Sequence, residues 1–256
     1  MNLVNLLKGL LNLQKKIDIK TLPSQGLFYK DDFEIYIKKA DIEDIIEYEH
    51  GYVKDNLGLI IEKLKKIVKK NIILSSNYTF YDIKSIDVIF IFFEIVHFTK
   101  GKSISLNYFD DEIGKEEVIE FSPKYFNYFT FDKELETSYD KKEKEIKING
   151  YKYTLPSIGV ENCLTNFLIS KSTAPDAVKY NSLNYNFTYF LNHRNQISFS
   201  EIENLIQIFN YDMDKSEIKK VADIVKKLSP IQRYTLRKGS KVIDINSKIN
   251  LEKIWK

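Results

Sequence analysis

The side chains best suited to catalysis or metal binding are few and widely separated. The histidines are His50, His97 and His193, and the single cysteine is Cys163. No two histidines have the spacing of a metal-binding motif, and one cysteine can form neither an internal disulfide nor a zinc cluster of cysteines. We interpret Cys163 as a small buried side chain and His97, in an apolar stretch, as a hydrogen-bonded core histidine. His50 precedes Gly51 at an expected helix end, where the helix dipole favours a cation.

The acidic run Asp110-Asp111-Glu112 is the remaining candidate for cation binding. It lacks the spacing of oxygen ligands in an EF-hand loop, so we interpret it as the solvated tip of a hairpin. The chain also lacks the patterns GxxxxGK[ST] and GxGxxG of phosphate-binding loops. The residues therefore predict a protein that is not an enzyme and that holds no cofactor or metal.

One short motif occurs twice, as TLPSQG over residues 21–26 and as TLPSIG over residues 154–159. A duplication, a phosphate-binding loop and a local turn are the three possible explanations. The prolines, Pro23 and Pro156, remove backbone donors that a phosphate site needs, and the sequences beyond the motifs diverge. We therefore predict turns.

In these turns proline fixes φ, serine bonds the local backbone, and glycine, here Gly26 and Gly159, supplies a positive φ. Each motif follows an alternating stretch, residues 17–22 in the first case and 151–155 in the second. We therefore predict that these two strands lie in the same sheet.

Composition limits the classes of function. The 256 residues are 43% hydrophobic and carry 39 basic and 36 acidic side chains, so the net charge is only +3. Arginine, the preferred residue for bidentate contacts to phosphate and guanine, occurs only at positions 194, 233 and 237. Nucleic acid is therefore not the expected partner. The most apolar stretch, Val88–Phe93, ends at Glu94 and is too short to span a membrane.

The first residues predict an amphipathic helix over residues 2–16. Leucines recur on one face of it, at Leu3, Leu6, Leu7, Leu10 and Leu13. This face either packs on the protein's own core or docks onto a partner protein. The segment lacks the basic start and the cleavage site of a signal peptide, so we expect the protein to be intracellular when made.

The remaining pattern predicts an α+β fold: an N-terminal strand pair and helices with a buried central helix, a mid-chain antiparallel sheet, and a C-terminal helical group. Expected strands are 17–22, 33–37, 104–108, 118–121, 126–131, 145–148 and 151–155, the last two joined by a type I′ turn at Asn149-Gly150. Expected helices are 41–48, 57–68, 86–98, 157–170, 183–193, 199–210, 215–228 and 230–237. We divide the chain into residues 1–16, an α+β domain of residues 17–156, and a mainly helical region of residues 157–256.

Several of these elements carry side chains with more than one interpretation. We expect Asp82 to cap the central helix 86–98 and Gly101 to end it, and Asp214 with Glu217 to start the helix 215–228 as a capping box. The helix 57–68 and the residues after it present a lysine face, Lys63, Lys65, Lys66, Lys69 and Lys70, which we interpret as solvated rather than as a patch for an acidic partner. Aromatic residues 125–129 are interpreted as packing between sheet and helices rather than as a platform for bases.

The chain resembles the baseplate hub assembly family of T-even-like contractile-tail phages. The resemblance rests on Leu22-Pro23-Ser24-Gln25-Gly26, on Asp82-Ile83 and Asp87-Val88-Ile89-Phe90, and on residues 117–131 and 146–156. It covers roughly residues 20–165. Val96-His97 stands where the family has a basic residue, Phe109-Asp110-Asp111 stands where some members have paired cysteines, and residues 166–256 are not explained by it.

The resemblance implies a structural or assembly component of a contractile tail baseplate, which acts by protein–protein association. It implies other baseplate or tail proteins as partners, an oligomer within the assembly, and a location in the host cytoplasm and then in the virion tail. Two alternatives stay open. One is an assembly chaperone that is absent from the finished virion, and the other is a module that binds nucleic acid or a host factor through the lysine face.

Overall fold

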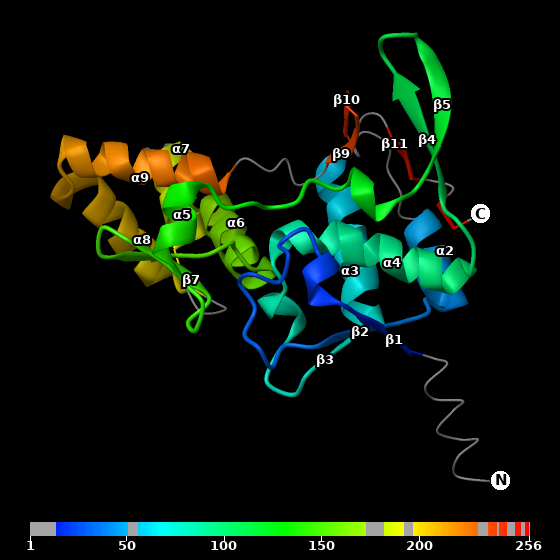
Figure 1. Ribbon diagram of the computed structural model, residues 1–256, viewed down its shortest axis with the longest axis horizontal. Helices are drawn as coiled ribbons and strands as arrows, with labels where there is room; N and C mark the ends of the chain where they lie inside the picture. Colours follow the sequence, from blue (N-terminus) through cyan, green and yellow to red (C-terminus); the bar gives the residue numbers. More distant parts are fainter. Residues whose placement is uncertain are drawn as a thin grey trace.

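Two groups of helices, each packed with small antiparallel sheets, form the α+β fold that the sequence predicts (Figure 1). The computed structural model describes residues 14–50, 56–172, 182–191, 197–229, 235–239, 241–244, 249–251 and 254–255. The five leucines of the predicted N-terminal helix and His193 lie outside these described residues.

The first core surrounds α4 (Val88–Lys100), in which every side chain from Val88 to Val96 is buried. A helix that is apolar on all sides must be covered on all sides, so the prediction of a buried central helix is confirmed. Gly101 ends α4 in a left-handed conformation with a φ of 64°, also as predicted.

The predicted N-cap of the central helix is wrong. Asp82 lies in a separate 3-10 turn, Phe80–Asp82, and its carboxylate accepts a hydrogen bond from the Thr79 amide at 2.6 Å. A second 3-10 turn, Ser85–Asp87, leads directly into α4. The competing local bond explains the difference, because Asp side chains readily cap the nearest free amide.

The N-terminal sheet has the order β1-β2-β3 and is antiparallel, with β1 at Gln14–Ile17, β2 at Ile35–Lys38 and β3 at Ile72–Leu74. The strand pair is therefore present, but the stretch predicted as strand 17–22 is mostly a 3-10 turn over Ile19–Thr21. Residues 14–16, predicted as the end of a helix, are strand instead. Pairing with β2 and the 2.6 Å ion pair between Lys15 and Glu94 of α4 favour the extended form.

Two amphipathic helices, α2 (Ile42–His50) and α3 (Leu57–Asn71), accompany this sheet. The buried residues of α3 are Ile60, Leu64, Ile67 and Val68, which recur at helical spacing. The Asn56 side chain caps α3 by accepting from the Leu59 amide at 3.1 Å.

Strands from the middle of the chain form two further antiparallel sheets, one of which also includes a strand near the C-terminus. One has the order β11-β4-β5, and the other β6-β7-β8. Their bounds are β4 Ser105–Asp110, β5 Lys115–Glu120, β6 Tyr139–Asp140, β7 Glu145–Ile148, β8 Tyr151–Tyr153 and β11 Ile249–Asn250. The hairpin at Asn149-Gly150 is confirmed, because both residues have the positive φ of a type I′ turn, 53° and 78°.

The strand predicted over residues 126–131 is wrong. Residues Pro123–Tyr125 form a 3-10 turn, and the chain then runs without regular structure from the first core to the second. The alternation that suggested a strand has another cause: Phe126 is buried in the first core and Phe129 in the second.

The second core is built from the remaining helices and the sheet β6-β7-β8. The helices are α5 Lys133–Ser138, α6 Ile158–Ser172, α7 Ser182–Phe190, α8 Phe199–Gln207 with a π-helical extension over Ile208–Asp212, and α9 Lys215–Leu228. The predicted capping box of α9 is confirmed, since Asp214 accepts from the Glu217 amide at 2.9 Å and Glu217 accepts from the Asp214 amide at 2.9 Å.

The C-terminal segment returns to the first core. Of the helix predicted for 230–237, the structure describes residues 235–237, and for these the prediction is wrong. They belong to β9 (Thr235–Lys238), which forms a hairpin with β10 (Lys241–Asp244). Leu236, Ile243 and Leu251 are buried in the first core, and β11 pairs with β4. Conversely, the sheet β6-β7-β8 contributes to the second core. Each core therefore contains residues from both of the ranges 17–156 and 157–256.

Phe92 tests the importance of the central helix. Its side chain is fully buried between Tyr48 and Trp255, so Phe92→Ala should create a cavity and lower the free energy of unfolding by ~3–5 kcal/mol. Chemical denaturation measures this loss. Phe109→Ala is the matched control, because Phe109 is 44% exposed, and it should cost less than about 1 kcal/mol. Equal losses in the two variants would show that α4 is not central.

Candidate functional site

The two copies of the repeated motif meet at one place, the segment of residues 82–87 that precedes α4. The amide of Ser24 in the first copy donates to Asp87 Oδ1 at 2.8 Å. The carbonyl of Pro156 in the second copy accepts from the Ser85 amide at 2.9 Å, and an antiparallel bridge joins Lys84 to Ser157. The motifs therefore contact the same segment from two sides.

The prediction that the strands before the two motifs share a sheet is wrong. β1 belongs to the sheet β1-β2-β3, whereas β8 belongs to the sheet β6-β7-β8. The motifs are related through the segment before α4, which hydrogen-bonds with each of them, and not through pairing of the strands that precede them.

The turn chemistry differs between the two copies. In the first, Gln25 and Gly26 have positive φ values of 54° and 70°, as predicted for Gly26, and the Pro23 carbonyl accepts from the Phe129 amide at 2.8 Å. A Cβ at Gly26 would also lie 3.1–3.2 Å from Ile19. In the second, Gly159 lies in the first turn of α6, so its predicted role in a turn is wrong.

Asp87 is the central group of this junction. Its side chain is fully buried, and Oδ2 accepts from the Tyr29 hydroxyl at 2.7 Å while Oδ1 accepts from Ser24. The Tyr29 oxygen in turn accepts from the Lys84 amide at 2.8 Å. Burial raises the pKa of Asp87 to about 6, although these hydrogen bonds and the Lys84 charge oppose the rise. Burial and the Asp87 charge also raise the pKa of Tyr29.

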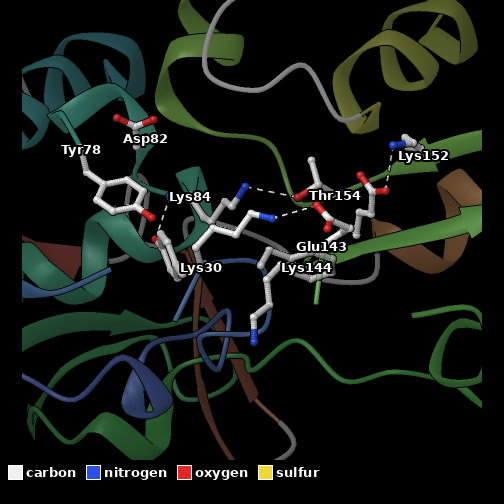
Figure 2. A pocket seen from close by; sticks show the side chains of 11 residues that line it. Lys30, Tyr78, Asp82, Lys84, Glu143, Lys144, Lys152 and Thr154 are labelled. Carbon is white, nitrogen blue, oxygen red and sulfur yellow. Dashed lines mark hydrogen bonds and ion pairs between the residues drawn. The ribbon is translucent and has the colours of Figure 1, made fainter. Parts of the chain in front are cut away.

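A cavity of about 520 Å³ opens beside this junction (Figure 2). It lies between the first turn, the segment before α4 and the hairpin β7–β8. Aromatic side chains and charged side chains both line it: Phe28, Tyr29, Lys30, Tyr78, Asp82, Lys84, Glu143, Lys144, Glu145, Lys152 and Thr154. These residues come from four separate segments of the chain, so no spacing in the sequence predicts that they lie together.

Most of the cavity lysines are paired with carboxylates. Nζ of Lys30 lies 3.1 Å from Glu143, Nζ of Lys152 lies 3.1 Å from Glu145, and Nζ of Lys144 lies 2.7 Å from Asp31 outside the cavity. Such pairs fix the orientation of side chains more than they stabilise the fold, because most of these groups are well exposed to water.

The lysine face of α3 is also largely occupied by partners from the chain itself. Lys65 pairs with Glu161 at 3.1 Å, Lys66 with Glu47 at 2.7 Å and Lys70 with Asp44 at 2.7 Å. Lys69 donates to the Tyr81 hydroxyl at 3.2 Å. These contacts neutralise much of the charge that a nucleic acid would need, which argues against that alternative.

The other residues singled out from the sequence are scattered. His50 ends α2 as predicted, but His97 is exposed in the last turn of α4, so its interpretation as a core histidine is wrong. Cys163 is partly buried, not fully buried as predicted. The acidic run lies at the tip of the β4–β5 hairpin, and Asp111 and Glu112 are exposed, as predicted. Asp110 is not solvated, because it is 4% exposed and lies 2.6 Å from Lys241 of β10.

The aromatic run 125–129 packs as predicted. Phe126 and Phe129 are buried, and the Phe126 ring contacts Phe90, Phe93 and Phe121. In the described ranges, no group of three or more histidine, cysteine or carboxylate side chains has the arrangement of a metal site. No helix within the same ranges is both long and apolar enough to cross a membrane.

Comparisons with family models, with curated proteins and with solved structures found no match.

The titration of Asp87 gives a pH-dependent prediction. Its raised pKa means that the folded state binds the proton more tightly than the unfolded state, whose carboxyl titrates near ~4. The stabilisation from this proton is complete below about pH 4 and lost as the pH rises through about 6. Asp87→Asn cannot titrate, so its free energy of unfolding relative to wild type should rise by roughly 1–3 kcal/mol between pH 4 and pH 7.5.

Denaturant unfolding at both pH values measures this difference. Asp31→Asn is the control, because Asp31 is exposed and Lys144 lowers its pKa, so its difference from wild type should not rise with pH. Parallel pH profiles for Asp87→Asn and wild type would show that the buried carboxyl does not titrate in this range.

Proposed function

We propose that this protein is a non-enzymatic structural or assembly component of a contractile phage tail baseplate and that it acts by binding other baseplate proteins. The family assignment comes from the sequence resemblance in residues 20–165. Support for association comes from one structural feature, the hairpin of β4 and β5, which projects away from the helices around α4 (Figure 1).

The two faces of this hairpin differ in character. Leu106, Tyr108 and Ile119 are buried on the inner face. On the outer face, strand register places Asn107 opposite Val118 and Phe109 opposite Glu116. Val118 is 63% exposed and Phe109 44% exposed, and Ile113 at the tip is 50% exposed. Large apolar side chains grouped on one exposed face are typical of an interaction surface.

The edge of the hairpin is also open to a partner. In the described part of the chain β5 pairs with β4 alone, so the outer backbone edge of β5 faces no other strand. An exposed edge strand offers hydrogen-bonding groups to an added strand. Glu116 and Glu120 flank Val118 on the exposed face, and neither has an ion pair among the described residues. The surface therefore fits a protein partner that presents a strand with apolar and basic side chains.

Neutral substitutions on the outer face test this proposal. Phe109→Thr with Val118→Thr keeps the β propensity and charge but removes apolar area, so the protein should fold normally and bind purified baseplates at least tenfold more weakly. A tenfold loss corresponds to about 1.4 kcal/mol, less than the ~1.5–3 kcal/mol from full burial of one large apolar side chain. Val242→Thr on the exposed face of β10 is the matched control.

Co-sedimentation with baseplates measures the binding, and thermal unfolding checks the fold. Unchanged binding by the double variant would exclude this hairpin as the contact. Mass spectrometry of purified particles distinguishes a retained component from a chaperone, because only a retained component is present at a fixed copy number.

The leucine face of residues 3–13 is the second contact to test. Deleting residues 1–13 leaves β1 and its ion pair to Glu94 in place. We expect a folded, soluble protein that fails to join its partners, since five leucines provide a strong apolar anchor. Circular dichroism and particle assembly are the measurements. If the deletion unfolds the protein, the leucines belong to its own core; normal assembly would exclude docking through this segment.

A further inference from the structure

Lys84 differs from the other lysines that line the cavity beside Asp87. Its ammonium donates to the Thr154 hydroxyl at 3.2 Å, and within the described ranges it forms no ion pair. An ammonium group has three donors, and a threonine hydroxyl is a weak substitute for a carboxylate. Figure 2 shows the Lys84 side chain extending toward Thr154, next to the Lys30 side chain that reaches Glu143.

The backbone holds Lys84 in this position. The Lys84 amide donates to the Tyr29 hydroxyl at 2.8 Å, and an antiparallel β-bridge joins the Lys84 backbone to Ser157. Both oxygens of Asp87 accept hydrogen bonds, from Ser24 and Tyr29, whereas Asp82 accepts from Thr79 through Oδ2 only, and its Oδ1 has no hydrogen-bond partner among the described residues. They influence Lys84 at longer range without forming a close pair.

The positive charge of Lys84 is therefore only partly balanced by the carboxylates near it. Burial lowers the pKa of Lys84 to about 8, even though Asp87 and Asp82 act to raise it. Lys84 is only partly exposed, and an ammonium in such a place without a close carboxylate among the described residues is costly to a fold; such groups are concentrated at functional sites.

We propose that this cavity binds a carboxylate group, which pairs with the Lys84 ammonium beside the Thr154 hydroxyl. The cavity volume of about 520 Å³ accommodates the group together with the methylenes that carry it, and Phe28 and Tyr78 supply apolar walls. A monoanion fits better than a phosphate dianion, because Glu143 and Glu145 also line the cavity and repel additional negative charge. The carboxylate comes from a free organic acid or from an acidic side chain of another protein.

The inference does not depend on the baseplate proposal, because the isolated full-length protein tests it. Amide resonances of isotope-labelled protein are followed by NMR during titration with sodium acetate, with a short peptide containing one glutamate and blocked termini, and with inorganic phosphate, all at constant ionic strength. We expect saturable shifts at Lys84 and Thr154 with the two carboxylates. Peptide binding at least tenfold tighter than acetate identifies a protein side chain as the source, and equal affinities identify a free acid.

Lys84→Met removes the ammonium and keeps a flexible chain, and it should abolish the saturable shifts. Lys219→Met, on the exposed face of α9, is the matched control for loss of one positive charge and should bind as wild type. Thr154→Val provides a second variant with the ammonium retained, and it should still bind. Thermal unfolding confirms that each variant is folded. Phosphate binding tighter than both carboxylates, retained binding in Lys84→Met, or the absence of saturable shifts with acetate and peptide would overturn the proposal.

Discussion

The buried carboxylate of Asp87 is the constraint on which the arrangement of this protein depends. It sits at the start of a helix whose surroundings are apolar, and it accepts hydrogen bonds from the first turn through Ser24 and Tyr29. A buried carboxylate without such donors would cost several kcal/mol, of order the stability of a whole domain. These hydrogen bonds hold the first turn against the start of the central helix. If the turn moved away, the buried carboxylate of Asp87 would lose its hydrogen-bond donors, and the folded state would be destabilised.

The same junction connects the two cores. Neighbouring residues belong to different cores on both sides of it: Tyr29 packs in the first and Phe28 in the second, while Ile83 packs in the first and Ile86 in the second. The second motif closes the junction through the Ser85 amide and the Pro156 carbonyl. Main-chain bonds and the buried side chain of Asp87 therefore hold the two groups of helices together at this junction.

Surfaces suited to association lie away from this junction. The β4–β5 hairpin gains rigidity from the inner face, where Tyr108 and Ile119 are buried, and from Lys241 of β10, which pairs with Asp110 at 2.6 Å and Glu112 at 2.9 Å. A rigid hairpin loses little conformational entropy when a partner binds. Exposed side chains such as Val118 therefore contribute more of their burial free energy to the binding affinity. The cavity at Lys84 has a different chemistry, because charged side chains line most of it, whereas the exposed face of the hairpin carries large apolar side chains.

The sequence by itself determined the elements whose pattern is local. The apolar run of α4, the capping box of α9, the Asn149-Gly150 turn and the stop at Gly101 were all predictable, because propensities, caps and positive φ values depend on neighbouring residues. Tertiary structure decided the elements that gain their stability from distant partners. Residues 14–16 are strand because β2 pairs with them, and β9 is strand because β10 pairs with it and Leu236 is buried in the first core. The junction at Asp87 and the cavity at Lys84 follow the same rule. Ser24 and Tyr29 lie more than fifty positions from Asp87, and Thr154 lies more than fifty positions from Lys84, so only folding brings each of these partners within hydrogen-bonding distance.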